Sequence, residues 1–322
     1  LHTRHENVQF VLNGLPDLPG IVSHYGEPIN NCAILYADQL ASQMKESATV
    51  VLSGNAADEV FGGYRSYTPA RVRNWATNVL GRVPPSLAIH LSGPGGRLKR
   101  VLERGRIPIH QWRASGLTTF GRAQMSRFCT KSFADSFCEL NPGRHVEQYA
   151  NECNPQTLLD TIRYTDLMVY HRHGHGAIPD TSGMRCGLEI RSPLLDHRII
   201  EFAATLPEKL LIPSLWNDRR NKLIMKESLL RYLPKDLVFA RKLGFGYNIN
   251  IRDFFRGPWR KAVGRRLLDS AYLDLGIFSR EGAQWALENS FGDAWMLLTF
   301  SVWADLFLFE QSGHAVAVIM SL

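Results

Sequence analysis

The chain has few cysteines, and their spacing matches neither a disulfide framework nor a zinc site. Five occur in 322 residues, an odd number with wide gaps and no Cys-x-x-Cys pair: Cys32, Cys129, Cys138, Cys153 and Cys186. Disulfide-stabilised domains and structural zinc sites use paired or closely spaced cysteines. The pattern therefore argues against both classes and favours a reducing, cytoplasmic setting.

Long apolar runs are also missing. The most apolar stretch leads toward residues 316–320 and is interrupted by charged residues such as Asp305 and Glu310. No stretch reaches the roughly 18 residues that a membrane-spanning helix needs. The N-terminus has neither an initiator Met nor a charged-then-apolar signal pattern. We therefore expect no membrane partner, and we expect Leu1 to lie inside a longer gene product.

The sequence has no block of like charge. It contains 37 Lys and Arg against 30 Asp and Glu, a formal net charge of +7, and 45% apolar residues, enough for a full core. Its densest basic stretches, residues 97–100 and 260–266, lie among apolar residues at helical spacing, which is typical of a solvated helix face. The composition favours a phosphate-bearing ligand slightly and does not favour a nucleic-acid partner.

The apolar pattern changes along the chain. In residues 1–69 short apolar runs alternate with a helical stretch, Cys32–Met44, and the β-branched run Thr49–Leu52 predicts a buried parallel strand that ends in a functional loop. In residues 70–322 apolar residues recur every three or four positions, as in helices. We predict an α/β fold, with a partial nucleotide-binding region over 1–69 and a mostly α-helical remainder over 70–322.

Small and acidic residues follow the predicted strand. Ser53 and Gly54 stand where the backbone can come close to a ligand, at the edge where open α/β sheets bind nucleotides. Asp58 and Glu59 precede an apolar pair, and burying two carboxylates is costly unless they meet a cation or hydrogen-bond donors. Magnesium with phosphate is one interpretation. The other is that both carboxylates begin a helix, with the glycines after it as a turn.

Charged and apolar residues alternate in a second segment, Asp180–Arg198. Glu189, Arg191 and Asp196 stand among leucines and isoleucines, which predicts a network of opposite charges among buried groups that orders a loop. Asp180 and Glu189 are candidates to face a substrate. A structural cluster without a ligand is at least as good an interpretation for Asp196.

A third segment contains Lys242 two residues before the Gly244-Phe245-Gly246 turn. A lysine beside such a turn can bring a mobile positive charge to a phosphate and stabilise the leaving group. An ordinary surface lysine is the alternative.

Three alternating histidines, His171, His173 and His175, precede the second segment. On a helix His171 and His175 share a face, as metal ligands four residues apart do, but no acidic or cysteine partner lies at ligand spacing. Polar lining of a substrate cleft, or an ordinary surface, is the other interpretation.

In their order and spacing the three segments resemble the synthetase domain of the glutamine-dependent asparagine synthetase family, whose relatives include β-lactam synthetases and lasso-peptide cyclases. The family's Ser-Gly-x-Gly-x-Asp-Glu-x-Phe-Gly-Gly-Tyr motif corresponds to residues 53–64. Its Asp-x-x-x-Met-x-x-x-x-Glu-x-Arg-x-Pro-x-Leu-Asp motif corresponds to 180–196, and its basic segment before a Gly-Phe pair to 241–245. The resemblance implies a Rossmann-like parallel sheet of the adenine-nucleotide alpha-hydrolase type.

The resemblance also implies a two-step ligase reaction with ATP and Mg²⁺. ATP activates a carboxylate as an acyl-adenylate, pyrophosphate leaves, and an amine attacks to give an amide and AMP. Ser53 and Gly54 would then contact ATP, Asp58 with Glu59 would hold the magnesium and pyrophosphate region, and Lys242 would offset charge on the phosphates. Such chemistry depends on positioning and charge neutralisation.

The remaining implied site residues are Asn55 and Glu189 as catalytic groups, and Asp180 and Arg191 as substrate-binding groups. The implied partners are a small-molecule or peptide carboxylate, an amine donor, a glutaminase domain or subunit, and a second copy in a homodimer. The assignments of the site residues come from the positions that match the family motifs.

The sequence departs from the family at several points. The pyrophosphate loop Ser-Gly-Gly-x-Asp-Ser does not occur in the printed residues, so Leu1 marks a truncation or the chain is a degenerate member. Asn55 stands where the family carries Glu or Asp, and an amide cannot accept a proton there. Ala56 replaces a glycine. Two alternatives therefore stay open: a non-catalytic binding or partner subunit, and a ring-closing amide synthetase.

Overall fold

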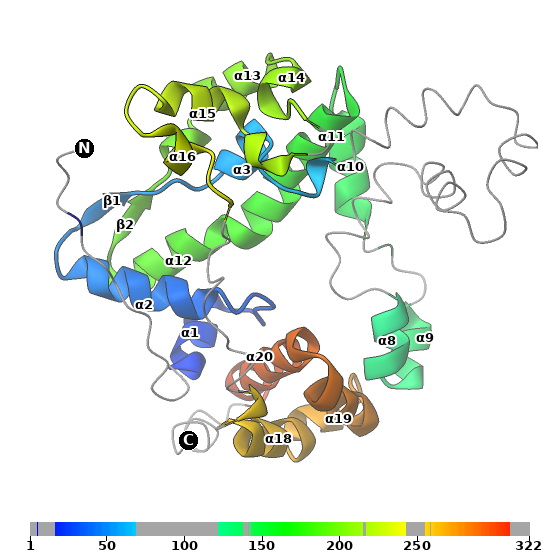
Figure 1. Cartoon of the computed structure of the whole chain (residues 1–322). Coiled ribbons are helices and arrows are strands. Elements are labelled where there is room, and N and C mark those ends of the chain that lie inside the picture. The colour runs from blue at the N-terminus through cyan, green and yellow to red at the C-terminus, as the bar shows by residue number, and fades with distance from the viewer. Residues whose placement is uncertain are drawn as a thin grey trace, which may run out of the picture.

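The computed structural model describes residue 5 and residues 17–68, 122–137, 141, 143–214, 217–242, 255–257 and 259–309. These ranges are mostly helical and contain one small parallel sheet (Figure 1). The predicted boundary at residues 69 and 70, the basic residues 97–100, Cys138 and the Gly244-Phe245-Gly246 turn lie outside the described residues.

The described elements follow the helical periodicity of the sequence closely. The α-helices in the first two thirds of the chain are α1 (Leu18–Tyr25), α2 (Ile34–Lys45), α3 (Ala57–Phe61), α8 (Arg122–Phe128), α9 (Lys131–Phe137), α10 (Arg144–Glu152), α11 (Leu158–Thr165), α12 (Ala177–Cys186), α13 (His197–Ala204) and α14 (Glu208–Leu211). They continue with α15 (Leu223–Leu229), α16 (Lys235–Val238), α18 (Arg260–Leu268), α19 (Arg280–Asn289) and α20 (Phe291–Phe307). Short 3-10 helices are η2 (Pro193–Leu195), η3 (Asp218–Arg220) and η4 (Ala271–Leu275), and a π-helix, η1 (Asp166–His175), precedes α12.

The sheet joins two segments that are far apart in the sequence. Strand β1 (Val50–Leu52) pairs in parallel with β2 (Glu189–Arg191), in the register Val50 to Glu189 and Leu52 to Arg191. The parallel strand predicted at residues 49–52 and the α/β class are thus confirmed. The Rossmann-like type and the boundaries at residues 69 and 70 stay predictions.

The burial predicted for the strand at residues 49–52 is wrong, and so is the burial predicted for the charged residues Glu189 and Arg191. Val50 is 43% and Leu52 74% exposed, and Glu189 and Arg191 are also exposed. In each strand the middle residue alone is half-buried, because the described sheet has two strands and each is covered on one face. A β-branched run thus identified the strand correctly, although it could not identify what covers it.

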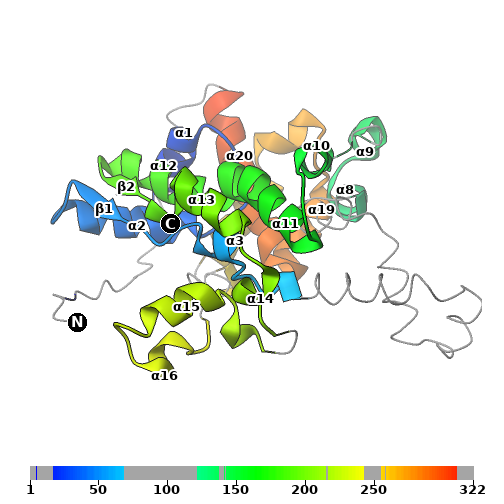
Figure 2. The same ribbon diagram turned by 90° about the horizontal axis from the view of Figure 1, so that it is seen from above.

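Two hydrophobic cores support the described helices. The α20 core packs α20 against α1, α18 and α19, with Trp295 at its centre, 1% exposed and donating from its indole Nε1 to the Ile29 carbonyl at 2.9 Å. The smaller α3 core packs α3 against α11 and α13 around Val60 and Ile162. Seen from above, α15 and α16 lie on the side of α3 away from α20 (Figure 2).

The helix ends show how the sequence fixes local boundaries. Thr157 and Asp160 form a capping box at the start of α11, and the Asp196 side chain accepts from the Arg198 N–H at the start of α13.

In the part of the chain that the structure describes, no helix is long and apolar enough to cross a membrane.

Candidate functional site

Both ends of α3 depend on left-handed backbone conformations. Ala56, at φ +68°, precedes α3, and Gly62, at φ +76°, ends it. Because a Cβ is disfavoured at positive φ, Ala56 carries strain that glycine avoids. The interpretation that Asp58 and Glu59 begin a helix, closed by a glycine turn, is confirmed.

Asp58 is held between two lysines from distant segments. Its Oδ1 lies 3.0 Å from Lys222 Nζ and its Oδ2 lies 2.7 Å from Lys242 Nζ. We call these three residues the lysine clasp. Burial opposes ionisation of Asp58, but the two ammonium groups outweigh it and hold the pKa of this carboxyl below its usual value. The structure thus brings Lys242 to the acidic segment, and it adds Lys222, which the sequence analysis did not assign.

The backbone on either side leaves room for the clasp. A Cβ on Gly63 would lie 1.8 Å from Asp58 Oδ1 and 2.9 Å from Lys222 Cδ, so no larger residue fits there without displacing the carboxylate. Lys222 itself has φ +61° at the residue before α15. Its backbone conformation is therefore strained at the point where its side chain reaches the site.

Glu59 faces the other way, into the protein. It is 3% exposed, its Oε1 accepts a hydrogen bond from the Tyr64 hydroxyl at 2.7 Å, and His171 Nδ1 lies 3.5 Å away. Burial opposes ionisation, yet His171 and Tyr64 outweigh it and hold the pKa of Glu59 below its usual value. The acidic partner that sequence spacing did not show for His171 is therefore Glu59.

Tyr64 connects the two carboxylates. Lys242 Nζ lies 4.9 Å from the centre of the Tyr64 ring, within the range of a cation–π contact, while the hydroxyl binds Glu59. Burial and the neighbouring Glu59 carboxylate raise the pKa of Tyr64 above its usual value. The phenol is therefore a hydrogen-bond donor rather than an acid at neutral pH.

A buried arginine on α11 holds α3 in place by hydrogen bonds to its backbone. Arg163 on α11 is 5% exposed and donates to the Glu59 carbonyl at 3.4 Å, to the Val60 carbonyl, and to the Ala203 carbonyl at 3.0 Å. Burial lowers the pKa of this guanidinium from its usual value. Arg163 was not identified from the sequence. The signal that could have found it is its position among apolar residues at helical spacing.

The predicted ATP-binding residues lie at the carboxyl end of β1. The Ser53 N–H donates to the Arg191 carbonyl at 2.8 Å, and the Asn55 N–H donates to Ser53 Oγ at 3.2 Å. A Cβ on Gly54 would meet no atom within 4 Å, so the space beside it is open. These contacts bring Ser53, Gly54 and Asn55 together with the end of β2.

The predicted buried charge network is wrong: the structure has two separate ion pairs, an exposed one between Glu189 and Arg191 and one that joins exposed Arg198 to partly buried Asp196. Arg191 Nε lies 2.7 Å from Glu189 Oε1, and Arg198 Nη2 lies 2.7 Å from Asp196 Oδ2. Glu189 and Arg191 are the first and last residues of β2, and both side chains lie on the face of the strand that is exposed to solvent. Asp196 caps α13, as its structural interpretation states, while Asp180 lies exposed on α12 and forms no ion pair with a described residue.

Among the described residues no group of three or more His, Cys, Asp or Glu could hold a metal ion by itself. Magnesium usually takes one or two carboxylates and completes its coordination with phosphate oxygens and water. Asp58 suits that pattern because its carboxylate lies beside cations that phosphates can attract. Glu59 suits it less, because Tyr64 and His171 already occupy its Oε1.

Comparison with known proteins identifies the family. A family model described as asparagine synthase matches residues 1–305. The chain belongs to the asparagine synthase family. It is 25% identical over 318 residues to asparagine synthetase [glutamine-hydrolyzing] 1 of Bacillus subtilis, covering 94% of this chain and 48% of that protein.

Other relatives agree with this assignment. A putative asparagine synthetase [glutamine-hydrolyzing] of Mycobacterium bovis is 26% identical over 266 residues, covering 80% of this chain and 37% of its own length. Asparagine synthetase [glutamine-hydrolyzing] 3 of Bacillus subtilis is 21% identical over 203 residues, covering 62% of this chain and 26% of that protein. The chain spans about half the length of the first of these relatives, or less of the others. The resemblance seen in the sequence motifs, to the synthetase domain, is thereby confirmed.

Proposed function

We propose that this chain carries the synthetase site of an ATP-dependent, AMP-forming amide ligase. A substrate carboxylate oxygen attacks the α-phosphorus of ATP, the bond to the β-phosphate oxygen breaks, and pyrophosphate leaves. An amine then attacks the acyl carbon of the adenylate, and its proton is lost as AMP departs and the amide forms. The observation that carries the proposal is the lysine clasp, because it places two cations and one carboxylate where family motifs meet.

In this reaction the two lysines neutralise charge on the departing pyrophosphate. In the clasp, each ammonium group has Asp58 as its counter-ion. An incoming polyphosphate offers more negative charge than one carboxylate, so Lys222 and Lys242 would turn toward it. Tyr64 keeps Lys242 close throughout, since its ring contacts the ammonium group without competing for the phosphate.

Magnesium fits beside Asp58. Once the lysines turn to the phosphates, the carboxylate of Asp58 would be free to hold the magnesium ion. Bound there, magnesium would supply further neutralisation of pyrophosphate. Glu59 would keep its place under α3 and hold Tyr64.

The open loop after β1 would receive the nucleotide. Ser53 and Gly54 lie at the carboxyl end of a parallel strand with free space beside Gly54, which suits backbone contacts with ATP. We propose Glu189, Arg191 and Asp180 as exposed groups that contact the carboxylate substrate or the amine. Asn55 would orient a reactant by hydrogen bonds, because its amide cannot accept a proton.

The larger assembly is also part of the proposal. The names of the relatives state that they hydrolyse glutamine, so a glutaminase domain or subunit is a reasonable source of the amine. We propose a cytoplasmic enzyme that acts on a small-molecule or peptide carboxylate and forms a homodimer.

The test is exchange of labelled pyrophosphate into ATP by the full-length protein, with a panel of carboxylates and with magnesium. Replacement Lys242→Gln should reduce exchange by about 100-fold, because a charge that stabilises the leaving group is lost. Lys261→Gln, an exposed lysine on α18, is the matched control and should exchange at the wild-type rate.

Equal exchange in Lys242→Gln and wild type would contradict the proposed role of the clasp. If the wild-type protein binds ATP but catalyses no pyrophosphate exchange with any carboxylate of the panel, a non-catalytic partner subunit becomes the better hypothesis.

A further inference from the structure

The basic stretch at residues 260–266 divides into an inward and an outward part. Arg266 on α18 points into the protein, where it donates to the Ser301 carbonyl at 2.7 Å and pairs with Asp305. The other cations of this stretch are exposed: Arg260, Lys261 and Arg265. One arginine thus supports the α20 core, while the remaining charges of α18 face outward.

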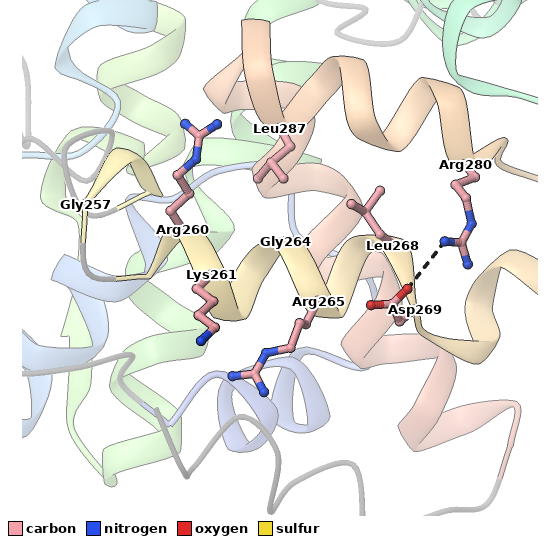
Figure 3. Close-up of a pocket in the computed structure, with 9 residues that line it drawn as sticks. All are labelled: Gly257, Arg260, Lys261, Gly264, Arg265, Leu268, Asp269, Arg280 and Leu287. Atoms are coloured by element: carbon pink, nitrogen blue, oxygen red, sulfur yellow. Dashed lines mark hydrogen bonds and ion pairs between the residues drawn. The ribbon is translucent and has the colours of Figure 1, made fainter.

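The outward cations line a shallow groove between α18 and α19 (Figure 3). It has a volume of about 560 Å³, and its apolar lining consists of Gly264, Leu268 and Leu287. A Cβ on Gly264 would lie 3.4 Å from Leu287 Cδ2, so the glycine leaves the space between the two helices open. We call this feature the α18 groove.

The cations of the groove lie on both sides of the helix. Figure 3 shows Arg260 pointing to one side of α18, while Lys261 and Arg265 point to the other. None of the three forms an ion pair with a described residue. Because cations that face different directions cannot close around one small anion, a ligand that contacts all of them must be elongated.

The groove has an excess of positive charge. Among its described lining residues Asp269 is the one acidic group, and it lies 3.4 Å from Arg280. Both side chains of this pair are 64% exposed, so the pair is weak and Arg280 can turn to another carboxylate at little cost. Four cations against one carboxylate make the groove complementary to an acidic partner.

We propose that the α18 groove binds an extended, acidic segment of a partner protein. In an extended segment successive side chains point to opposite sides, so its carboxylates reach the cations on both sides of α18. Apolar side chains of the same segment can cover Leu268 and Leu287, which are half-buried. The helix has 9 residues, a length of about 13 Å that about four extended residues span.

Two other polyanions fit the groove less well. Its described lining contains no aromatic side chain on which a nucleic-acid base could stack. Helices that lie on anionic membranes bury an apolar face, whereas α18 turns apolar residues such as Val263 and Leu267 toward the α20 core. An acidic peptide is therefore the occupant that the lining favours.

The test measures binding of the peptide Glu-Asp-Leu-Glu-Asp-Leu-Glu, labelled at its N-terminus, to the full-length protein by fluorescence anisotropy. The double replacement of Arg260→Gln with Arg265→Gln should weaken binding by about tenfold, because two exposed charge contacts of about threefold each are lost. Arg144→Gln is the matched control, since Arg144 is also an exposed arginine at the first position of a helix, and it should bind the peptide like the wild type.

A steric variant tests the same place without a change of charge. Gly264→Met adds a side chain in the groove, where a Cβ would meet Leu287, and should weaken peptide binding by about fivefold or more. Methionine favours a helix more than glycine does, so this variant should fold, which circular dichroism checks.

Several outcomes would overturn the docking surface. They are equal affinities in the wild type and both groove variants, equal binding of a peptide with Gln and Asn in place of its acidic residues, and failure of the wild type to bind at millimolar peptide. Tighter arginine-dependent binding of a short single-stranded DNA or of phosphatidylserine vesicles would also reject the acidic peptide as occupant. Peptide binding that the groove variants weaken and the control retains would support it.

Discussion

The α20 core and the α3 core differ in size and in how many buried polar groups they contain. The α20 core is large and aromatic, and its buried ion pair joins Arg266 to Asp305 at one edge. The α3 core is small and is crossed by buried polar groups, among them Glu59, Arg163 and His171. Burying charge is costly unless each charge finds partners, so the smaller core gives up stability for defined positions. The site lies on the core that fixes geometry, not on the one that buries more apolar surface.

The largest effect should come from the α20 core. Replacement Trp295→Ala removes a side chain that is 1% exposed and its hydrogen bond to Ile29, and it should lower the free energy of unfolding by about 3–5 kcal/mol. Urea denaturation measures this. The matched control Trp303→Ala removes a more exposed indole and should cost clearly less. Equal losses would show that α20 is not packed as described.

An intermediate effect should come from Arg163. The change Arg163→Met keeps the length of the side chain but leaves the carbonyls of Glu59, Val60 and Ala203 without their donor, at a cost of about 1–3 kcal/mol. Unlike Trp295→Ala, it should also reduce ATP-dependent stabilisation of the folded protein, because α3 carries Asp58. Thermal melts with and without ATP compare the two variants. Arg172→Met, an exposed neighbour, should affect neither quantity.

The smallest effect should appear in acid. The pKa values of Asp58 and Glu59 are lower in the folded chain than in the unfolded one, so their contribution to stability is complete above about pH 4 and is lost as the pH falls through the folded values. The melting temperature should therefore fall below pH 4. Glu59→Gln should flatten that decline, whereas Asp269→Asn, on the exposed end of α18, should retain it. A decline of the same steepness in Glu59→Gln would contradict this account.

The sequence was informative where local pattern decides the structure. The sequence predicted the strand at residues 50–52, the helix around Asp58 and Glu59, and the helices of the later part of the chain, because a β-branched run and helical spacing report local conformation. The family resemblance further connected Lys242 with the acidic segment, although the motif itself contains no distance.

Contacts between distant segments were not predictable. Arg163 is separated from Glu59 by 104 positions, and helical spacing shows that a side chain faces a core without showing which partner it meets. The partner of His171 and the role of Lys222 were missed for the same reason. The burial of Glu189 and Arg191 was predicted wrongly because their alternation with apolar residues is the same whether a strand has covered or open faces.

Asp58 gives the free protein an internal substitute for the charge of its ligand. The two lysines are already oriented around a carboxylate, so the proposed polyphosphate ligand would not have to order them, and little conformational entropy would be lost at that step. The same carboxylate excludes weak competitors, because a single chloride cannot match its two short ion pairs. In the proposed reaction the clasp would therefore act as a threshold: ions of low charge would leave the two ion pairs intact, and only a highly charged ion would displace Asp58 from the lysines.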